Sequence, residues 1–398
     1  MDESNDITSV IERYESYVRA DPGNPLLWMN LGDLYHKSGR FDEAIACFER
    51  CLHDHPEYVS ARSRIASVMI SQHRFADAEQ VLRHVLHESP QDPNLLFNLG
   101  LTLYFQERWA EAERSLARSI ALGQTLPDAH AYLARCLHRA GNMQAAIQAC
   151  QHWLESARGT ESGGYLALLH MDHGDMAQAH RLALDVLKKD PDNTDAGIVV
   201  GTASIESQDI ATAEEQFARI LAREPDNARA WLGMGLINLY RQQHPEAVTA
   251  LQRAAELLPS SSGIFVTLGW AKIVARDLAG AEAVFRHALE VDHNFGEAHG
   301  GLATALALQG RIDDARQAIT RARRLNPQSF GAGFAQTLVL KLQGQERDAI
   351  DLLSNMLMQT ARPDAQPLIE QIRLYASRNP LFGRPNQKGP RNEPPPAR

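Results

Sequence analysis

Residues 25–58 set the pattern of the whole chain; they read PLLWMNLGDLYHKSGRFDEAIACFERCLHDHPEY. The stretch holds two apolar patterns of helical period, with a break at Gly39 between them. Pro56 lies near its end, and the residue before a proline avoids the α conformation, so a helix is expected to stop there. The stretch therefore predicts two helices joined by a short turn.

One alanine of this stretch recurs along the chain. Successive copies are 34, 34, 34 and 33 residues apart, and then 34 apart five more times. Chance does not produce such a series, so the chain is a tandem repeat of helix pairs. Helix pairs must stack to bury their apolar faces. The recurring alanines are Ala44, Ala78, Ala112, Ala146, Ala179, Ala213, Ala247, Ala281, Ala315 and Ala349.

A second column of small residues precedes each alanine by twelve positions. A mostly apolar column follows each alanine by four positions, beginning with Phe48. Small residues are expected where two helices cross closely and leave no space for a larger side chain. The small column is Gly32, Ala66, Gly100, Ala134, Ala167, Gly201, Gly235, Gly269, Ala303 and Thr337.

The period of 34 and these columns resemble the tetratricopeptide repeat. The resemblance implies an all-α fold, a right-handed α-α superhelix of helix-turn-helix repeats whose first helices line a concave groove. In repeat 1, residues 25–58, the signature positions of the family hold Trp28, Leu31, Gly32, Tyr35, Ala44, Phe48 and Pro56.

The repeat pattern divides the chain into five expected segments. They are an N-terminal capping half-repeat at 1–24, repeats 1–4 at 25–159, repeats 5–10 at 160–363, a solvating helix at 364–379 and a tail at 380–398. The tail has six prolines and two glycines and is basic, a composition that cannot bury a core, so it is expected to be disordered.

The junction at 156–164 departs from the pattern. It is one residue short, and Gly163 and Gly164 stand where a helix should begin. Glycines there predict a frayed or bent junction that acts as a hinge. The alternative is an untidy repeat in a continuous stack.

Composition excludes several classes of protein. The chain has 40 basic and 49 acidic residues, so its net charge of −9 gives no global case for nucleic-acid binding. Four cysteines are too few for a disulfide-built secreted domain. No run of 18 apolar residues predicts a membrane span, and the acidic start does not look like a signal peptide. A cytoplasmic location is the expectation.

The sequence offers no catalytic motif. Repeats account for nearly all of residues 7–378, and there is no Gly-rich phosphate loop, nucleophile elbow or paired CxxC. We therefore expect a protein that is not an enzyme and has no cofactor. Cys47 and Cys51, near His53 and His55, have a spacing that zinc sites use, but Cys51 falls in a core column, so core packing is favoured and no metal site is predicted.

The groove-facing places lie about 15, 11 and 8 residues before each repeat alanine, on one face of the first helix, and the position that follows the last of them is counted with them. Repeats 6 to 9 present an apolar trough at these places, and Trp270 is expected to lie open in it as an anchor for the partner. Repeat 3 presents a second apolar patch, which adjoins basic residues on repeat 4. The alternative is a tight superhelix in which these residues pack on neighbouring repeats. The predicted partner-binding residues are Phe97, Leu101, Tyr104, Phe105, Arg135, Arg139, Ile198, Leu232, Leu236, Tyr240, Val266, Trp270 and Ile273.

Such a groove is expected to bind a protein partner through an amphipathic helix or an apolar extended segment. The lysine–asparagine clamp of co-chaperone arrays is missing, since Met29 and Asp33 stand at its places, and Asp33 would repel a carboxylate. By analogy with regular bacterial-type arrays, we expect an adaptor or assembly factor of a secretion, surface-appendage or polysaccharide system. A peptide-sensing regulator and a self-assembling scaffold subunit are the alternatives, and the oligomeric state is left open.

Overall fold

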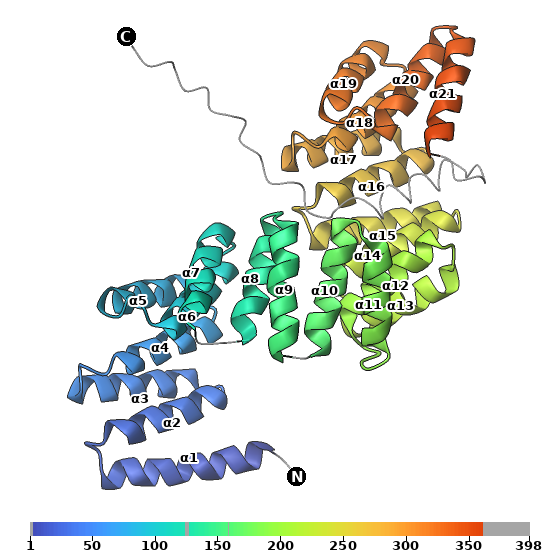
Figure 1. Ribbon diagram of the computed structural model, residues 1–398. Helices are drawn as coiled ribbons and strands as arrows, with labels where there is room; N and C mark the ends of the chain where they lie inside the picture. Colours follow the sequence, from blue (N-terminus) through green and yellow to red (C-terminus); the bar gives the residue numbers. More distant parts are fainter. Residues whose placement is uncertain (1–2, 124–126, 158, 361–398) are drawn as a thin grey trace, which may run out of the picture. The chain divides into compact units, whose positions relative to one another are not determined.

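The computed structural model describes residues 3–123, 127–157 and 159–360 (Figure 1). Every regular element in these ranges is an α-helix, and there are 21 of them. The expected all-α class and the solenoid of helix-turn-helix repeats are therefore confirmed. The expected solvating helix at 364–379 and the tail at 380–398 lie outside the described residues.

The helices form two compact units, Met1–Arg158 and Gly159–Arg398, and their boundary falls within the 156–164 junction. Unit 1 holds α1 (Glu3–Ala20), α2 (Pro25–Lys37), α3 (Phe41–Asp54), α4 (Val59–Ser71), α5 (Phe75–Glu88), α6 (Pro93–Phe105), α7 (Trp109–Ala121), α8 (Pro127–Arg139) and α9 (Met143–Ala157). Unit 2 holds α10 (Thr160–His173), α11 (Met176–Leu187), α12 (Thr194–Glu206), α13 (Ile210–Arg223), α14 (Ala228–Tyr240), α15 (His244–Leu257), α16 (Ser262–Val274), α17 (Leu278–Val291), α18 (Gly296–Leu308), α19 (Ile312–Leu325), α20 (Phe330–Leu342) and α21 (Glu346–Thr360).

Each repeat contributes two consecutive helices, from α2 and α3 in repeat 1 to α20 and α21 in repeat 10. Within each repeat the two helices pack on each other, and α1 packs on α2. The even-numbered helices from α2 to α20 are the first helices of their repeats. Several begin at a side-chain cap that accepts a backbone N–H, for example Asn24 before α2, Asp92 before α6 and Asn227 before α14.

The repeat alanines form the centre of the core. Nine of the ten are fully buried, and Ala349 is 5% exposed. The small column meets the apolar column as expected: a Cβ at Gly32 would lie 2.5 Å from the Phe48 ring, and one at Gly100 would lie 2.6 Å from Leu116. The predicted close crossing of the two helices in a repeat is confirmed for these pairs.

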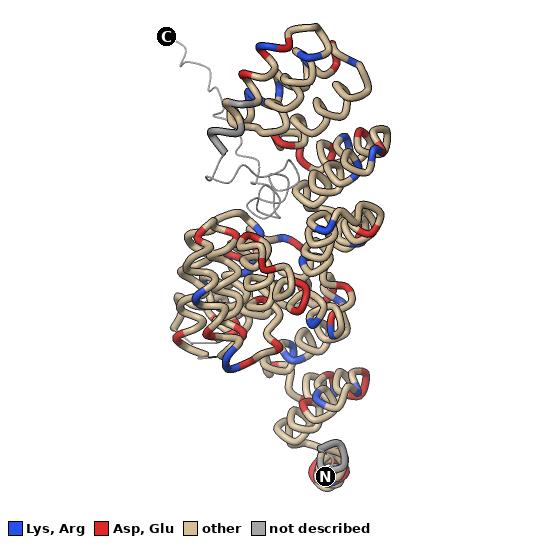
Figure 2. The backbone as a smooth tube through the Cα atoms, turned by 90° about the vertical axis from the view of Figure 1, so that its right-hand side faces the viewer, with Lys and Arg blue, Asp and Glu red and all other residues tan. Residues whose placement is uncertain are grey.

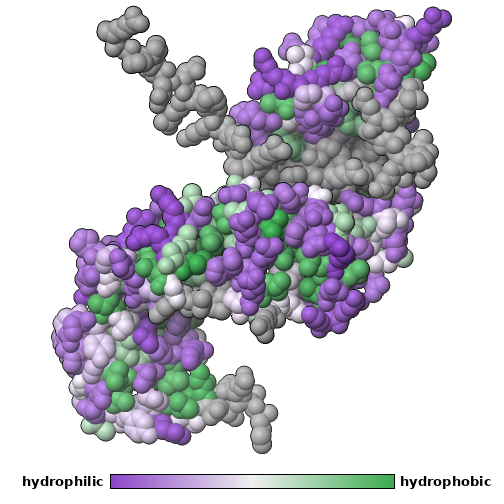
Figure 3. Space-filling view, in the orientation of Figure 1, coloured by the Kyte–Doolittle hydropathy of each residue, from purple (hydrophilic) through white to green (hydrophobic). Residues whose placement is uncertain are grey.

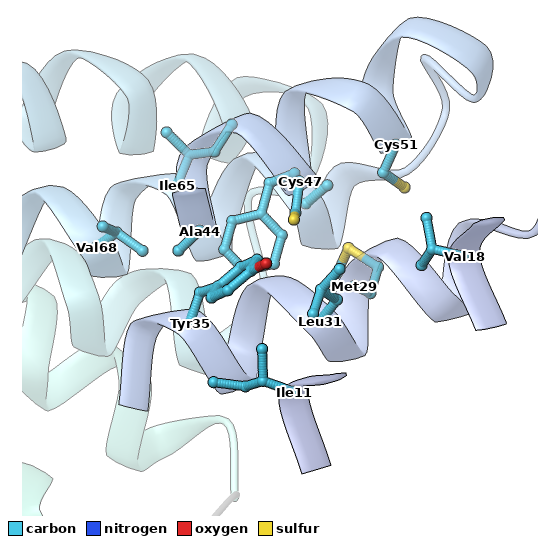
Figure 4. Close-up of a cluster of buried hydrophobic side chains, with 12 residues drawn as sticks. Ile11, Val18, Met29, Leu31, Tyr35, Ala44, Cys47, Cys51, Ile65 and Val68 are labelled. Carbon is cyan, nitrogen blue, oxygen red and sulfur yellow. The ribbon is translucent and has the colours of Figure 1, made fainter. Parts of the chain in front are cut away.

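Figure 4 shows this packing in unit 1, where Ala44, Cys47 and Cys51 of α3 lie over Met29 and Tyr35 of α2. All four cysteines, including Cys136 and Cys150, are free and buried, so the assignment of Cys51 to the core is confirmed. Among the described residues no group of three or more histidine, cysteine, aspartate or glutamate side chains has the geometry of a metal site.

The two glycines at the junction have a packing role. Gly163 and Gly164 lie in the first turns of α10 and are buried. A Cβ at Gly164 would lie 2.1 Å from the side-chain oxygen of Asn193, the residue that caps α12. Asn193 also donates a hydrogen bond to the Thr160 carbonyl at 3.2 Å. The expectation that these glycines fray the helix is therefore wrong, because they lie inside α10 and let α12 begin directly against it. The hinge at this junction stays a prediction.

Charges are spread along the described backbone, with basic and acidic residues interspersed (Figure 2). Of the helices in the described ranges, none combines the length and apolar character that a membrane span requires.

Candidate functional site: an aromatic–arginine surface on unit 1

The predicted patch on repeats 3 and 4 is an interlocked set of aromatic rings. Tyr132 of α8 lies at its centre, with ring centroids 5.1 Å from Tyr104, 6.2 Å from Phe105 and 6.4 Å from Phe97 of α6. Phe105 also stacks on Phe75 of α5, 5.2 Å away. Such ring pairs contribute ~0.5–1.5 kcal/mol beyond the area they bury, so they hold one another in fixed orientations.

Two arginines of α8 border these rings. The Arg135 guanidinium carbon lies 5.5 Å from the Tyr132 ring centroid and 5.0 Å from that of Trp153, and the Arg139 carbon lies 5.8 Å from that of Trp109. Cations over aromatic faces gain ~0.5–1 kcal/mol at exposed sites. We call Phe75, Phe97, Leu101, Tyr104, Phe105, Trp109, Tyr132, Arg135 and Arg139 the aromatic–arginine surface.

This surface is partly open to solvent. Phe105 is 44% exposed, Arg139 is exposed, and Phe97, Leu101, Tyr104 and Arg135 are half-buried. Burial raises the pKa of the Tyr104 hydroxyl, and the nearby charges of Arg135 and Arg139 oppose that rise. The hydroxyl therefore keeps its proton at neutral pH and remains a hydrogen-bond donor.

On the face that Figure 3 shows, hydrophobic residues form separate patches among hydrophilic ones.

Six members of the aromatic–arginine surface were predicted from the groove-facing positions: Phe97, Leu101, Tyr104, Phe105, Arg135 and Arg139. The other three, Phe75, Trp109 and Tyr132, were not predicted. Tyr132 stands fourteen residues before Ala146, one position beyond the fifteen-residue column. Phe75 and Trp109 each stand three residues before a repeat alanine, at the start of a second helix. An aromatic residue at that place in three successive repeats, beginning with Phe41 in repeat 1, is the signal that could have found them.

A polar stretch of unit 1 joins the preceding first helices. Arg64 of α4 donates from its Nε to both oxygens of Asp33 on α2, at 2.7 and 3.0 Å. Asn98 of α6 donates to the Ser67 hydroxyl of α4 at 3.2 Å. The charge on Asp33, which was expected to repel a carboxylate, is therefore offset by Arg64.

The trough predicted on unit 2 is mostly closed. Val266 is fully buried, Trp270 is 2% exposed, Ile198 and Leu236 are each 3% exposed, and Leu232 is 9% exposed. The expectation that these five side chains lie open on the concave surface is wrong. Tyr240 and Ile273 are half-buried.

The predicted trough residues are buried because successive first helices of unit 2 pack tightly on one another. The Trp270 ring lies 6.0 Å from Phe285 and 6.1 and 6.5 Å from Phe330 and Phe334, which belong to α20, two first helices further along. Between them α18 is lined with small residues: a Cβ at Gly300 would lie 2.8 Å from the Ala332 nitrogen. The tight superhelix, stated above as the alternative, describes this part of unit 2.

Comparison with protein-family models matches two tetratricopeptide repeat models to the chain, one at residues 3–66, 37–99 and 274–333, the other at 97–160 and 200–262. The chain belongs to the tetratricopeptide repeat family. A comparison with curated protein sequences gives no match.

Three solved structures are similar to this tetratricopeptide array. The crystal structure of the yeast Tom70 is 16% identical, with 94% of this chain and 91% of that chain covered and a TM-score of 0.40. YrrB, described as a TPR protein with an unusual peptide-binding site, is 16% identical over 47% of this chain and 96% of its own, with a TM-score of 0.39. The MamA protein is 20% identical over 42% of this chain and 92% of its own, with a TM-score of 0.38. The identities and TM-scores are too low for the function of any of these proteins to be assigned to this chain.

Proposed function

We propose that this tetratricopeptide array is a non-catalytic interaction scaffold that binds a segment of a protein partner at the aromatic–arginine surface of unit 1. The observation that carries the proposal is the 44% exposure of Phe105 within a fixed group of rings. Aromatic residues and arginine are the types most enriched among residues that dominate binding energy. Rings held by their neighbours lose little conformational freedom when a partner binds.

The chemistry of the surface suits an apolar segment that also carries carboxylates. The rings offer flat apolar area, while Arg135 and Arg139 place positive charge at its border. An amphipathic helix or an extended segment with one apolar face satisfies both demands. The family is the reason for expecting a protein partner.

We also propose an adaptor or assembly role in a bacterial-type multiprotein system, by analogy with other regular arrays. A cytoplasmic location fits the four free, buried cysteines, because reducing compartments keep thiols unpaired.

A displayed peptide library tests the binding proposal. Peptides enriched on the full chain are measured against Phe105→Glu and against Leu184→Glu, a control in α11 with a similar exposure of 41%. We expect Phe105→Glu to weaken binding roughly thirtyfold or more and Leu184→Glu to leave it unchanged. Equal binding by both variants and the wild type, with helical circular dichroism intact, contradicts the proposed surface.

A further inference from the structure

A buried ion pair joins two first helices of unit 2 that are not neighbours. Arg229 of α14 donates to both carboxylate oxygens of Asp172 on α10, at 3.1 and 2.6 Å, across 57 positions of sequence. Their side chains are only 14% and 6% exposed. Burial works against the charge of Arg229, but the Asp172 carboxylate outweighs it and raises the pKa of the guanidinium.

The pair lies on the concave side of the repeats. Asp172 stands seven residues before Ala179, the groove-side place that Phe105 and Tyr240 hold in their repeats. Arg229 stands one helical turn before Leu232, another groove-side place. Both partners therefore project from the groove face of their helices.

Helix α12 lies between the two partners. It packs on α10 and α14 at its sides and on α11 and α13 behind. The remaining face of α12 carries Ile198 and Ile205 at its groove-side places, and we infer that the bridge from α10 to α14 passes over this face. These two side chains are 3% and 5% exposed.

Stability alone does not explain an ion pair at this place. Taking two charges out of water offsets most of their attraction, so a buried pair adds little net stability. A two-bond contact between guanidinium and carboxylate does fix the distance and orientation of the groups that carry it. The pair therefore sets how far α10 and α14 stand apart.

We propose that Arg229 and Asp172 form a latch that holds α10 and α14 together over α12 and keeps the concave face of unit 2 closed. While the latch is formed, the apolar groove residues of α12 are covered. When it separates, they become accessible to solvent. Unit 2 is thus a gated surface, in contrast to the open surface of unit 1. The latch does not depend on the function proposed for unit 1, since it is defined without any partner.

The test uses the full chain and an environment-sensitive hydrophobic dye. Arg229→Met removes the latch. Arg241→Met is the matched control, because Arg241, the C-cap residue of α14, also makes a two-bond pair, at 2.7 and 2.6 Å, but with Glu214 of the adjacent helix α13 and at the exposed surface. We expect Arg229→Met to keep its helical circular dichroism, to raise dye fluorescence about threefold or more and to increase the radius of gyration. We expect Arg241→Met to change neither reading.

The charge-exchanged double variant, Arg229→Asp with Asp172→Arg, restores the pair in the opposite sense. It is expected to bring dye binding back to the wild-type level, and it decides the matter if Arg229→Met does not fold. The latch is refuted if folded Arg229→Met stays closed, if Arg241→Met opens the array equally, or if the exchanged variant binds dye or fails to fold.

Discussion

The ring of Phe285 in α17 lies directly against the backbone of Gly301 in α18. A Cβ at Gly301 would lie 2.2 Å from the ring, closer than real atoms approach. The same ring fills the space beside Gly269 in α16, where a Cβ would lie 2.6 Å away. Phe285 is fully buried. Two glycines on successive first helices thus make room for one aromatic ring, and the ring joins repeat 8 to repeat 9.

This arrangement predicts that Gly301→Ala destabilises the array. The new methyl group must displace a ring that is packed on every side, an overpacking that costs ~1–3 kcal/mol. The reading is the urea midpoint of the helical signal. Gly23→Ala is the control, because nothing lies within 4 Å of a Cβ at Gly23. A Gly301→Ala midpoint equal to that of the wild type would show that the ring can move aside.

The second prediction contrasts two aromatic residues. Trp270→Ala should lower the free energy of unfolding by ~3–5 kcal/mol, because the indole is 2% exposed and packs on three rings. Phe105→Ala should cost only ~1 kcal/mol, since that ring is 44% exposed. Thermal melts of the two variants, measured side by side, show which substitution lowers the stability more. The assignment of Trp270 to the core fails if its variant melts no lower than that of Phe105.

The fold could be predicted from sequence because its decisive contacts are local. The repeat alanine, the small residue twelve positions before it and the apolar residue four positions after it meet within one helix pair, as Gly32, Ala44 and Phe48 do. Every repeat imposes the same steric demand, so the same residue types recur at the same interval.

The site was only partly predictable, because exposure depends on how tightly successive repeats wind. The groove columns correctly placed Phe105 at an exposed surface. They failed for Trp270, since its cover comes from Phe330 and Phe334 in α20, two repeats away. The Arg229–Asp172 pair spans a similar interval. The sequence pattern compares each repeat only with the family's signature positions. It therefore carries no information about contacts between helices two repeats apart.

A third prediction concerns the buried carboxylate of Glu297 in α18. Its oxygens accept hydrogen bonds from the Asn326 amide at 2.7 Å and the Ser329 hydroxyl at 3.0 Å. Burial raises the pKa of Glu297 from its usual 4.5 to about 6, although these hydrogen bonds and one from the Gly331 backbone oppose the rise. The folded protein therefore holds this proton more tightly than the unfolded chain. Protonation contributes stability that is complete below pH 4.5 and lost as the pH rises through about 6.

Glu297→Gln removes this titration. The difference in unfolding free energy, wild type minus variant, should therefore increase by ~2 kcal/mol as the pH falls from about 7.5 to about 4.5. Urea denaturation of both proteins across that range measures it, and the shared titration of all other groups cancels in the difference. Parallel curves for the two proteins would mean that Glu297 is not buried as a charged group.

The last prediction concerns the four cysteines. Burial raises the pKa of the Cys47 and Cys136 thiols to about 12, and it also raises the pKa of Cys51. Since the thiolate is the reactive form, native thiols should be inert to a thiol-specific reagent at about pH 8. All 4 cysteines should react once the chain is unfolded in guanidinium. Leu184→Cys, at a site that is 41% exposed, supplies the positive control and should add one thiol that reacts in the native protein. Rapid native labelling of any wild-type cysteine, at a rate close to that of the control, would place that residue outside the core and contradict its burial in the structure.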